Sequence, residues 1–312
     1  MVQPINIDEI YLKALGSEIF VLGHKNPDVD SLVSTYLMAK ILKHFNINAT
    51  PSILIPIEQV DLFTKEVLND FGISLSEFNY IIPEPNNLFF LVDHNDVSES
   101  IGEGFEVLGV IDHHSRITTL QNVCIKEFNS NSLLIFDIFK HKYDFSTLEK
   151  KQILISTMID TCFLKSSRTQ KENNHLIKML VSEHSNLNEF ISQLESKYFV
   201  GSDFSKSIEE LALNGTKEHS ICDELIISSY IEHKNSLDIK VIDSLRDYIQ
   251  EESKRLSSKR LFIIINIEEG NTKALYFKDG NLIIQLTYDC IASRGSKVIP
   301  DLKKFLNKMK HA

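Results

Sequence analysis

Short apolar runs alternate with longer amphipathic stretches over the first 185 residues. Five runs have the length and composition of buried strands, at residues 18–23, 50–56, 88–94, 107–114 and 123–128. Helical spacing of apolar positions occupies most of the intervals, at residues 31–45, 60–72, 129–142 and 148–160. Continuous apolar strands that alternate with helices favour an α/β fold with a mostly parallel, doubly wound sheet covered on both faces. In such sheets ligands bind at the carboxyl ends of the strands.

The pattern changes after a polar segment around residues 183–190. Apolar runs in a hairpin-like order predict strands at residues 224–232, 261–270, 272–280 and 281–289. A long polar helix is expected at about residues 236–257, and a last helix starts at Pro300, because proline suits the first helical turn. We therefore predict a smaller α+β C-terminal domain that closes over the first domain. The predicted boundaries are residues 1–185 for the first domain, 186–192 for a linker and 193–312 for the second domain.

The composition is that of an ordinary globular protein, with 43% hydrophobic and 24% charged residues among 312. The sequence has no run of about eighteen apolar residues that could span a bilayer, and its first residues do not resemble a secretory signal. We therefore expect a soluble, cytoplasmic protein. The four cysteines are widely spaced and form no CxxC pair, which favours reduced thiols over a zinc site or a disulfide framework.

The chain is acidic, with a formal net charge of -10 at pH 7. This charge disfavours binding to nucleic acid, because a polyanion is repelled by a negatively charged protein. An anionic substrate would for the same reason need metal cations beside it. The expected partner is therefore a small anionic substrate, with no nucleic acid and no membrane, and a homodimer through the N-terminal domain is left open.

Side chains that bind metals stand where several predicted strands end. A single aspartate at a strand end is more often a helix cap or a loop residue. Here, however, three strand ends carry aspartate or histidine, at the edge where this fold binds ligands. Imidazole combined with carboxylates suits Mn, Zn, Fe or Co. The residues are His24, Asp28 and Asp30 after the first run, Asp93 after the third, Asp112, His113 and His114 after the fourth, and Asp160 in a predicted helix.

The number of these candidate ligands exceeds what one ion needs. Two of these histidines and four of these aspartates already suffice for two ions that share a bridging carboxylate. A pair of ions about 3.5–4 Å apart lowers the pKa of a shared water towards 7 and clamps the attacking and leaving oxygens of a phosphoryl transfer. The pattern therefore indicates hydrolysis of a phosphate ester or a phosphoanhydride.

Several short motifs together resemble the DHH phosphoesterase superfamily. They are GHKNPDVDS at residues 23–31, LVDHND at 91–96, IDHH at 111–114 and the pair Asp160 and Thr161. Within that superfamily, HKNPDVDS is similar to the HxNPDxDS signature of family II, the metal-dependent inorganic pyrophosphatases. Near the end of the chain, SRGSKVIPDL at residues 293–302 resembles the SRKKQVVPPL of that family's C-terminal DHHA2-type domain. The resemblance thus covers both predicted domains in order.

The resemblance implies hydrolysis of inorganic pyrophosphate to two phosphates by a hydroxide that bridges two Mn²⁺ or Co²⁺ ions, with Mg²⁺ arriving on the substrate. It implies that His24, Asp28 and Asp93 hold one ion, and that Asp30, Asp93, His113 and Asp160 hold the other. Asp93 is then the shared, catalytic carboxylate, and His114 contacts the substrate phosphate and assists the leaving group. Lys197 and Arg294 match the cationic residues that bind phosphate from the second domain.

One departure from the family pattern lies beside Arg294. The family has two lysines after this arginine, whereas Gly295 and Ser296 follow it here. A charge-assisted contact with phosphate contributes about 1.5–3 kcal/mol, so the absence of the first lysine weakens the prediction that pyrophosphate is the substrate. Lys297 is our candidate for a replacement, also as a substrate-binding residue.

Two other functions therefore stay open. The first is an exopolyphosphatase or another DHH-type phosphoesterase that acts on short polyphosphate or small nucleotides. A glycine-rich, histidine-bearing loop in the second domain would favour cleavage of oligonucleotides, and the sequence contains none. The second is a non-catalytic, metal-dependent sensor of phosphorylated ligands. A sensor predicts a broken ligand set, yet every predicted metal position is filled.

Overall fold

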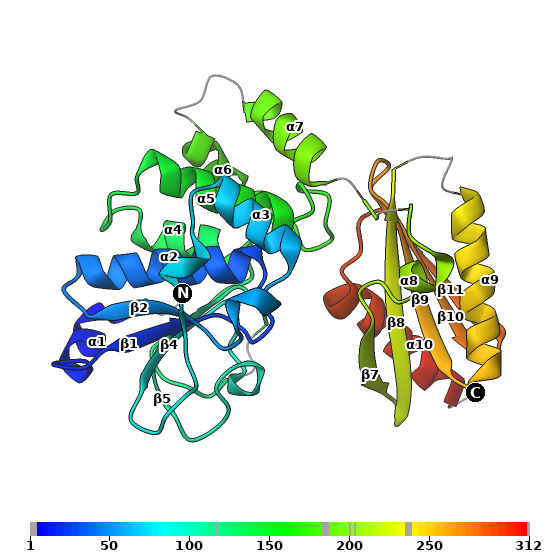
Figure 1. Ribbon diagram of the computed structural model, residues 1–312, viewed down its shortest axis with the longest axis horizontal. Helices are drawn as coiled ribbons and strands as arrows, with labels where there is room; N and C mark the ends of the chain where they lie inside the picture. Colours follow the sequence, from blue (N-terminus) through cyan, green and yellow to red (C-terminus); the bar gives the residue numbers. More distant parts are fainter. Residues whose placement is uncertain are drawn as a thin grey trace. The chain divides into compact units, whose positions relative to one another are not determined.

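The computed structural model describes residues 5–115, 118–181, 187–199, 201, 202, 204–234 and 239–310. The chain divides into two compact units, which Figure 1 shows. The first unit comprises Met1–Phe163 and Thr169–Ser192, and the second comprises Leu164–Arg168 and Gln193–Ala312. Of the predicted linker at 186–192, residues 187–192 are described, and they form the first part of helix α7 (Leu187–Tyr198). Within the described ranges, no helix is both long enough and apolar enough to cross a membrane.

The described residues of the first unit form a six-stranded sheet in the order β3-β2-β1-β4-β5-β6, and every strand pair is parallel. All five strands predicted for this unit are present. The short edge strand β3 was not predicted, because its two residues are exposed and belong to no apolar run. The strands are β1 (Ile19–Leu22), β2 (Ala49–Ile53), β3 (Asn79–Tyr80), β4 (Leu88–Val92), β5 (Glu106–Asp112) and β6 (Val123–Ile125).

Helix α2 packs directly on β1, β2 and β4, and helices α4 and α5 pack on α2 (Figure 1). Polar side chains cap these helices at their first turn: Asp28 for α2, Asp61 for α3, Ser130 for α4 and Ser146 for α5. The helices are α1 (Ile7–Lys13), α2 (Val29–His44), α3 (Leu62–Asp70), α4 (Asn131–Phe139), α5 (Thr147–Asp160) and α6 (Asn174–Val181).

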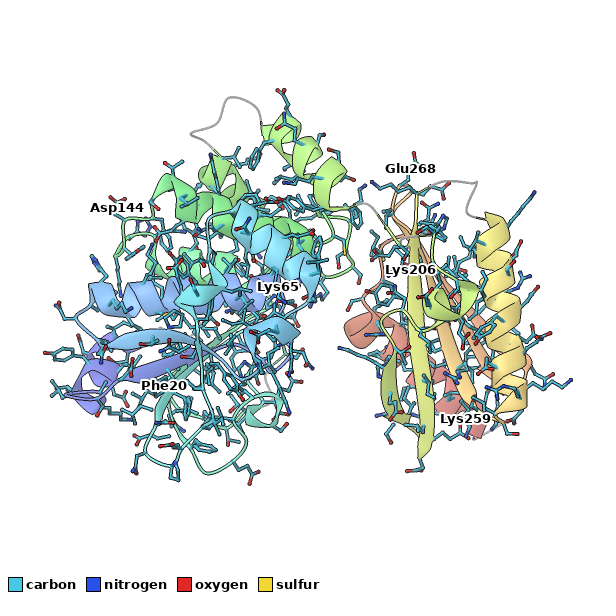
Figure 2. All side chains as sticks on the ribbon, viewed as in Figure 1. Phe20, Lys65, Asp144, Lys206, Lys259 and Glu268 are labelled. Carbon is cyan, nitrogen blue, oxygen red and sulfur yellow. The ribbon has the colours of Figure 1, made fainter. Side chains whose placement is uncertain are left out.

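The sheet places its most apolar strands at the centre of the first unit. Strands β1 and β4 are almost wholly buried, as their continuous apolar sequences predict. The ring of Phe20, labelled in Figure 2, lies 6.1 Å from that of Phe89 on the neighbouring strand. The chain leaves β1 for β2 on one side and reaches β4 on the other, so the order of strands reverses between β1 and β4. Such a reversal is where α/β sheets bind ligands.

Glycine at position 23 allows helix α2 to approach the end of β1 closely. A Cβ atom added there would lie 1.9 Å from Oγ of Ser31, a buried side chain in the first turn of α2. We expect Gly23→Ala to lower the free energy of unfolding by roughly 1–3 kcal/mol, the usual cost of overpacking. Chemical denaturation would measure it. Gly295→Ala is the matched control, because its added Cβ has no heavy atom within 4 Å. Equal stabilities of the two variants would contradict the expectation.

The described residues of the second unit form a five-stranded sheet in the order β11-β10-β9-β8-β7. Strands β8 and β9 are parallel and the other pairs are antiparallel, so the sheet is mixed. Strand β7 was not predicted, because three of its five residues are exposed. The strands are β7 (Lys217–Ile221), β8 (Glu224–His233), β9 (Lys259–Asn266), β10 (Asn271–Lys278) and β11 (Asn281–Tyr288).

Helices α8 (Ile208–Ala212) and α9 (Ile239–Arg255) cover one face of this sheet (Figure 1). Their buried residues Leu211 and Leu245 pack against Phe262 of β9 in one apolar cluster. A π-helical turn, Arg294–Val298, leads into the last helix, α10 (Ile299–Lys310), which was predicted from Pro300 onward. The unpredicted turn bears Arg294 and Lys297.

Candidate metal centre

The predicted metal ligands come together at one edge of the first sheet. His24 follows the end of β1 by two residues, Asp93 directly follows β4, and His113 directly follows β5. Strands β1, β4 and β5 are parallel neighbours, so their carboxyl ends meet at the same edge. Helices α2 and α5 add carboxylates from their first and last turns. These are Asp28 and Asp30 for α2 and Asp160 for α5.

Asp93 lies at the middle of the cluster. Its Oδ2 is 3.4 Å from Nε2 of His24, and its Oδ1 is 3.2 Å from Nε2 of His113. Oδ1 is also 3.8 Å from Nδ1 of His114. Only 2% of Asp93 is exposed. The two oxygens of one buried carboxylate therefore face two different histidines.

Two groups of candidate ligands have atoms close enough together to hold a cation, and Asp93 belongs to the first of them. In the first group, ligand atoms of His24, Asp28 and Asp93 all lie within 4.8 Å of one another. In the second group the same holds for Asp30, His113 and Asp160, where Nε2 of the histidine is 3.9 Å and 3.8 Å from the two carboxylates. The two groups together contain the six predicted ligands, and a third group of the described residues joins Asp93 to His113 and His114. The assignment of these residues to two ions stays a prediction.

The carboxylates of helix α2 are held in place by backbone donors. Asp28 caps the helix through Oδ1, which accepts a hydrogen bond of 3.0 Å from the Ser31 amide, and its Oδ2 is 3.8 Å from His24. Asp30 is buried and accepts bonds of 2.6 and 3.1 Å from the first two amides of helix α4, and one of 2.5 Å from the Ser156 hydroxyl. Amides at a helix N-terminus favour a negative charge, so these donors partly offset the cost of burying the Asp30 carboxylate.

His113 is oriented as a metal ligand would be. Its Nδ1 is 3.1 Å from the carbonyl oxygen of Phe128, which can only accept a hydrogen bond, so Nδ1 carries the proton. Nε2 of the neutral ring is then an acceptor directed at the carboxylates, and metal-binding histidines are commonly fixed in this way. His94 differs, because its two ring nitrogens contact Val92 O at 2.9 Å and Ser100 Oγ at 2.7 Å. It supports the loop after β4 and offers no nitrogen to an ion.

Asp112 orients His114, a role that the sequence analysis missed. Oδ1 of this buried aspartate accepts hydrogen bonds from His114 Nδ1 at 2.8 Å and from the His114 amide at 3.1 Å. Its Oδ2 accepts one of 2.5 Å from Nδ2 of Asn95. The side chain of His114 is 45% exposed, so the imidazole held by Asp112 reaches solvent. The only sequence signal for this pair was their spacing within IDHH.

The backbone at Asp93 has a left-handed conformation, with φ of 62°. Its amide still donates to the Ile111 carbonyl oxygen at 3.0 Å, so the turn begins while the chain is paired with β5. Among residues with a Cβ atom, aspartate and asparagine tolerate this conformation best. Uncommon backbone conformations concentrate at functional sites. The turn places the Asp93 carboxylate between the two histidines.

The cluster has the electrostatics of a cation site. Burial opposes ionisation of Asp93, but contact with His113 and His24 outweighs it and lowers the pKa of this carboxyl. Burial likewise opposes protonation of the two histidines, yet Asp93 raises the pKa of His24 to about 9 and that of His113 to about 10. Burial and the charge of Asp93 raise the pKa of Asp30. Without a cation, the buried carboxylates therefore hold protons on their histidines.

These residues fit a divalent cation. Oδ1 of Asp93 is buried and accepts no hydrogen bond from the described residues, so it keeps a lone pair for an ion. Mixed imidazole and carboxylate donors suit Mn²⁺ and related ions, which bind neutral histidine and release its proton. A cavity of about 320 Å³ opens beside the cluster, lined by residues that include Asp28, Asp30 and Asp160.

The predicted phosphate-binding residues Arg294, Lys297 and Lys197 lie in the second unit. Arg294 contacts the carbonyl oxygen of Gly215 through Nη1, and its guanidinium lies 5.7 Å from the ring centre of Tyr230. Lys297 forms an ion pair of 3.3 Å with Asp301, one turn further along the chain. Lys197 is exposed in the last turn of α7, where Nζ lies 5.0 Å from the ring centre of Tyr198. Their contact with substrate stays a prediction.

Comparison with known proteins identifies the first unit. Residues 18–164 match the model of the DHH family, N-terminal domain. The motifs that suggested this superfamily, from GHKNPDVDS to IDHH, lie within the matched residues, so the recognition from sequence is confirmed.

Relatives extend the likeness beyond the DHH domain. A manganese-dependent inorganic pyrophosphatase of Methanocaldococcus jannaschii is 26% identical over 92% of this chain and 99% of its own. A Bacillus cereus protein named probable manganese-dependent inorganic pyrophosphatase is 33% identical, over 31% of each chain. The crystal structure of a Methanococcus jannaschii family II inorganic pyrophosphatase covers 92% of this chain and 98% of its own, with a TM-score of 0.67 and 22% identity. That structure confirms the predicted fold class, and the relatives support the predicted hydrolase.

Proposed function

We propose that this protein is a manganese-dependent inorganic pyrophosphatase, which hydrolyses pyrophosphate to two phosphates at the DHH domain. The observation that carries the proposal is the position of Asp93, whose two oxygens face His24 and His113 at 3.4 and 3.2 Å. One carboxylate so placed can serve two cations, the arrangement used in phosphoryl hydrolysis. The Methanocaldococcus jannaschii relative, aligned over 99% of its length, supports the same substrate.

The DHH domain would hold the cations with the ligands already described. When bound, two Mn²⁺ or Co²⁺ ions would lower the pKa of a shared water towards neutrality, and together with substrate-borne Mg²⁺ they would neutralise phosphate charge. His24, Asp28 and Asp93 would hold one ion, and Asp30, Asp93, His113 and Asp160 would hold the other. The α4 amides that bind Asp30 and the Phe128 carbonyl that binds His113 would keep these ligands in place.

His114 is positioned to donate a proton to the leaving phosphate. Its Nδ1 donates to the Asp112 carboxylate, so Nε2 is directed away from that carboxylate. Burial opposes protonation of this imidazole, but Asp112 outweighs it and raises the His114 pKa, which favours the charged, proton-donating form. A protonated imidazole near the substrate acts as a general acid at neutral pH.

We expect Asp112→Asn to lower kcat by about 10- to 100-fold, the usual effect of removing a hydrogen-bonded support residue. Because Asp112 raises the His114 pKa, its loss should also move the alkaline limb of the rate profile to lower pH. Initial rates between pH 5 and 10 would measure both effects. Asp96→Asn is the control, since Asp96 caps a short turn nearby. An unmoved alkaline limb would remove Asp112 from this role.

The substrate is tested by phosphate release from pyrophosphate, tripolyphosphate and a dinucleotide, each with Mn²⁺ or Mg²⁺ as the only divalent ion. We expect pyrophosphate with Mn²⁺ to be hydrolysed fastest. Faster release from tripolyphosphate would instead favour a polyphosphatase. No turnover of any compound with Mn²⁺ would overturn the proposal and favour a binding protein.

A specific observation keeps short polyphosphate as the second candidate. Gly295 has no side chain to contact phosphate, and Lys297, our candidate replacement, is paired with Asp301 at 3.3 Å. The turn itself therefore offers less free positive charge beside Arg294 than the family pattern implies. A short polyphosphate has more than two phosphate groups, several of which could contact metal ions. Its binding would therefore depend less on positive side chains beside Arg294.

A further inference from the structure

The hairpin of β7 and β8 carries a lysine and a histidine beside Arg294. Lys217 pairs directly with Ser228 across the two strands. Side chains alternate between the faces of a strand, so Lys217, His219 and Ser228 lie on one face of the hairpin. The turn that bears Arg294 reaches the same place, because Nη1 of Arg294 is 3.4 Å from Oγ of Ser228.

The Ser228 hydroxyl contacts both the imidazole of His219 and the guanidinium of Arg294. Oγ of Ser228 is 2.8 Å from Nε2 of His219, and the serine is fully buried. Arg294 is further fixed by the carbonyl oxygen of Gly215 and by the ring of Tyr230. The imidazole of His219 and the guanidinium of Arg294 therefore contact the same buried hydroxyl, which fixes their positions relative to each other. The group that joins them is a neutral hydroxyl, which does not cancel the charge of the guanidinium.

Donor atoms of both groups remain for a ligand. Nδ1 of His219, and Nε and Nη2 of Arg294, make no hydrogen bond to any described residue. Burial lowers the pKa of His219, and the charges of Arg294 and Lys217 lower it further. Both charges that act on this imidazole are thus positive. An unneutralised guanidinium beside an imidazole with an open nitrogen is typical of a site for an anion.

We propose that His219 is a phosphate-positioning residue, which together with Arg294 binds a phosphate group of the substrate or the orthophosphate product. The proposal rests on the proposed function for the identity of the anion. The phosphate would accept hydrogen bonds from the open nitrogens of His219 and Arg294, and its charge would favour protonation of the imidazole. The next position, Gly295, carries no side chain, so His219 supplies a contact that the turn itself lacks.

A mutant cycle tests this role, because position 295 can accept a side chain. A Cβ atom there would have no heavy atom within 4 Å. We expect His219→Ala to raise both KM for pyrophosphate and the inhibition constant of orthophosphate by about tenfold, the effect of one charge-assisted contact, with a smaller change in kcat. Gly295→Lys should restore most of this loss in the His219→Ala background and change the wild-type values by less. His175→Ala, an exposed histidine of the first unit, is the control.

A second variant separates binding from folding. His219→Gln keeps a polar group near Ser228 but cannot become charged, so we expect an unchanged melting temperature with the same tenfold loss of orthophosphate affinity. Unchanged KM and inhibition constants in both variants, or effects of His219→Ala and Gly295→Lys that simply add, would overturn the proposal. If the wild type hydrolyses no pyrophosphate, the proposed function fails. Calorimetric titration of wild type and His219→Gln with orthophosphate and Mn²⁺ then decides the role of His219 separately.

Discussion

Asp93→Asn should abolish pyrophosphate hydrolysis, with a fall in kcat of roughly 1,000-fold or more. Cations contribute several kcal/mol to a phosphoryl transition state, and each 1.4 kcal/mol corresponds to a factor of ten in rate. Asparagine offers one weakly basic oxygen where the carboxylate has two, each within 3.4 Å of a histidine. Both ligand groups are therefore expected to lose affinity for Mn²⁺.

We expect this substitution to leave the fold intact for a physical reason. Asp93 has φ of 62°, and asparagine tolerates that left-handed conformation as well as aspartate does. Steady-state rates and the number of Mn²⁺ ions bound per chain, measured by titration calorimetry, would give the result. Asp96→Asn makes the same chemical change three residues along and should keep both properties. Near-normal turnover by Asp93→Asn would eliminate the shared carboxylate from the proposal.

Removal of divalent cations should have the second large effect. We expect a chelator to reduce pyrophosphate hydrolysis to background, and added Mn²⁺ to restore it. The melting temperature should rise with Mn²⁺, because a ligand at a hundred times its Kd stabilises the folded state by about 2.7 kcal/mol. Thermal unfolding with and without Mn²⁺ would measure this, with Asp93→Asn as the control. A chelated protein that retains full activity would rule out the metal-dependent proposal.

The affinity for Mn²⁺ should increase with pH. In the metal-free protein the pKa values of His24 and His113, about 9 and 10, exceed the ordinary 6.5. Their protonation therefore stabilises the metal-free fold fully below pH 6.5, and this stabilisation is lost as the pH rises through 9 to 10. A cation must displace these protons, so Kd should fall between pH 7 and 9. Titrations in buffers of different ionisation enthalpy would count the protons, and a Kd independent of pH would contradict the expectation.

The apolar periodicity was sufficient to predict the central strands of both units. Strands β1, β4 and β5 are buried on both faces, so their sequences are continuously apolar and their ends are marked by the first polar residue. The edge strands β3 and β7 escaped prediction because exposed strands need no apolar run. Pairing with a neighbouring strand, which the local sequence does not record, makes them strands.

The sequence was also enough to predict that the residues of the candidate site lie together. Three parallel strands that end in aspartate or histidine have to bring those residues to one edge of the sheet. The supports were not predictable, because they come from distant segments. Asp30 accepts hydrogen bonds from amides 101 and 102 residues away, and His113 donates one to a carbonyl oxygen 15 residues away.

The sequence by itself determined which chemical groups this protein has and at which strand ends they stand, because those features depend on residue type and periodicity. Only the tertiary structure decided which atoms meet. It turned Asp112 towards His114 rather than towards the metal ligands, paired Lys297 with Asp301, and joined His219 to Arg294 through Ser228. Such contacts depend on side-chain direction, and the one between Arg294 and Ser228 joins segments 66 residues apart in the chain, which no local pattern encodes.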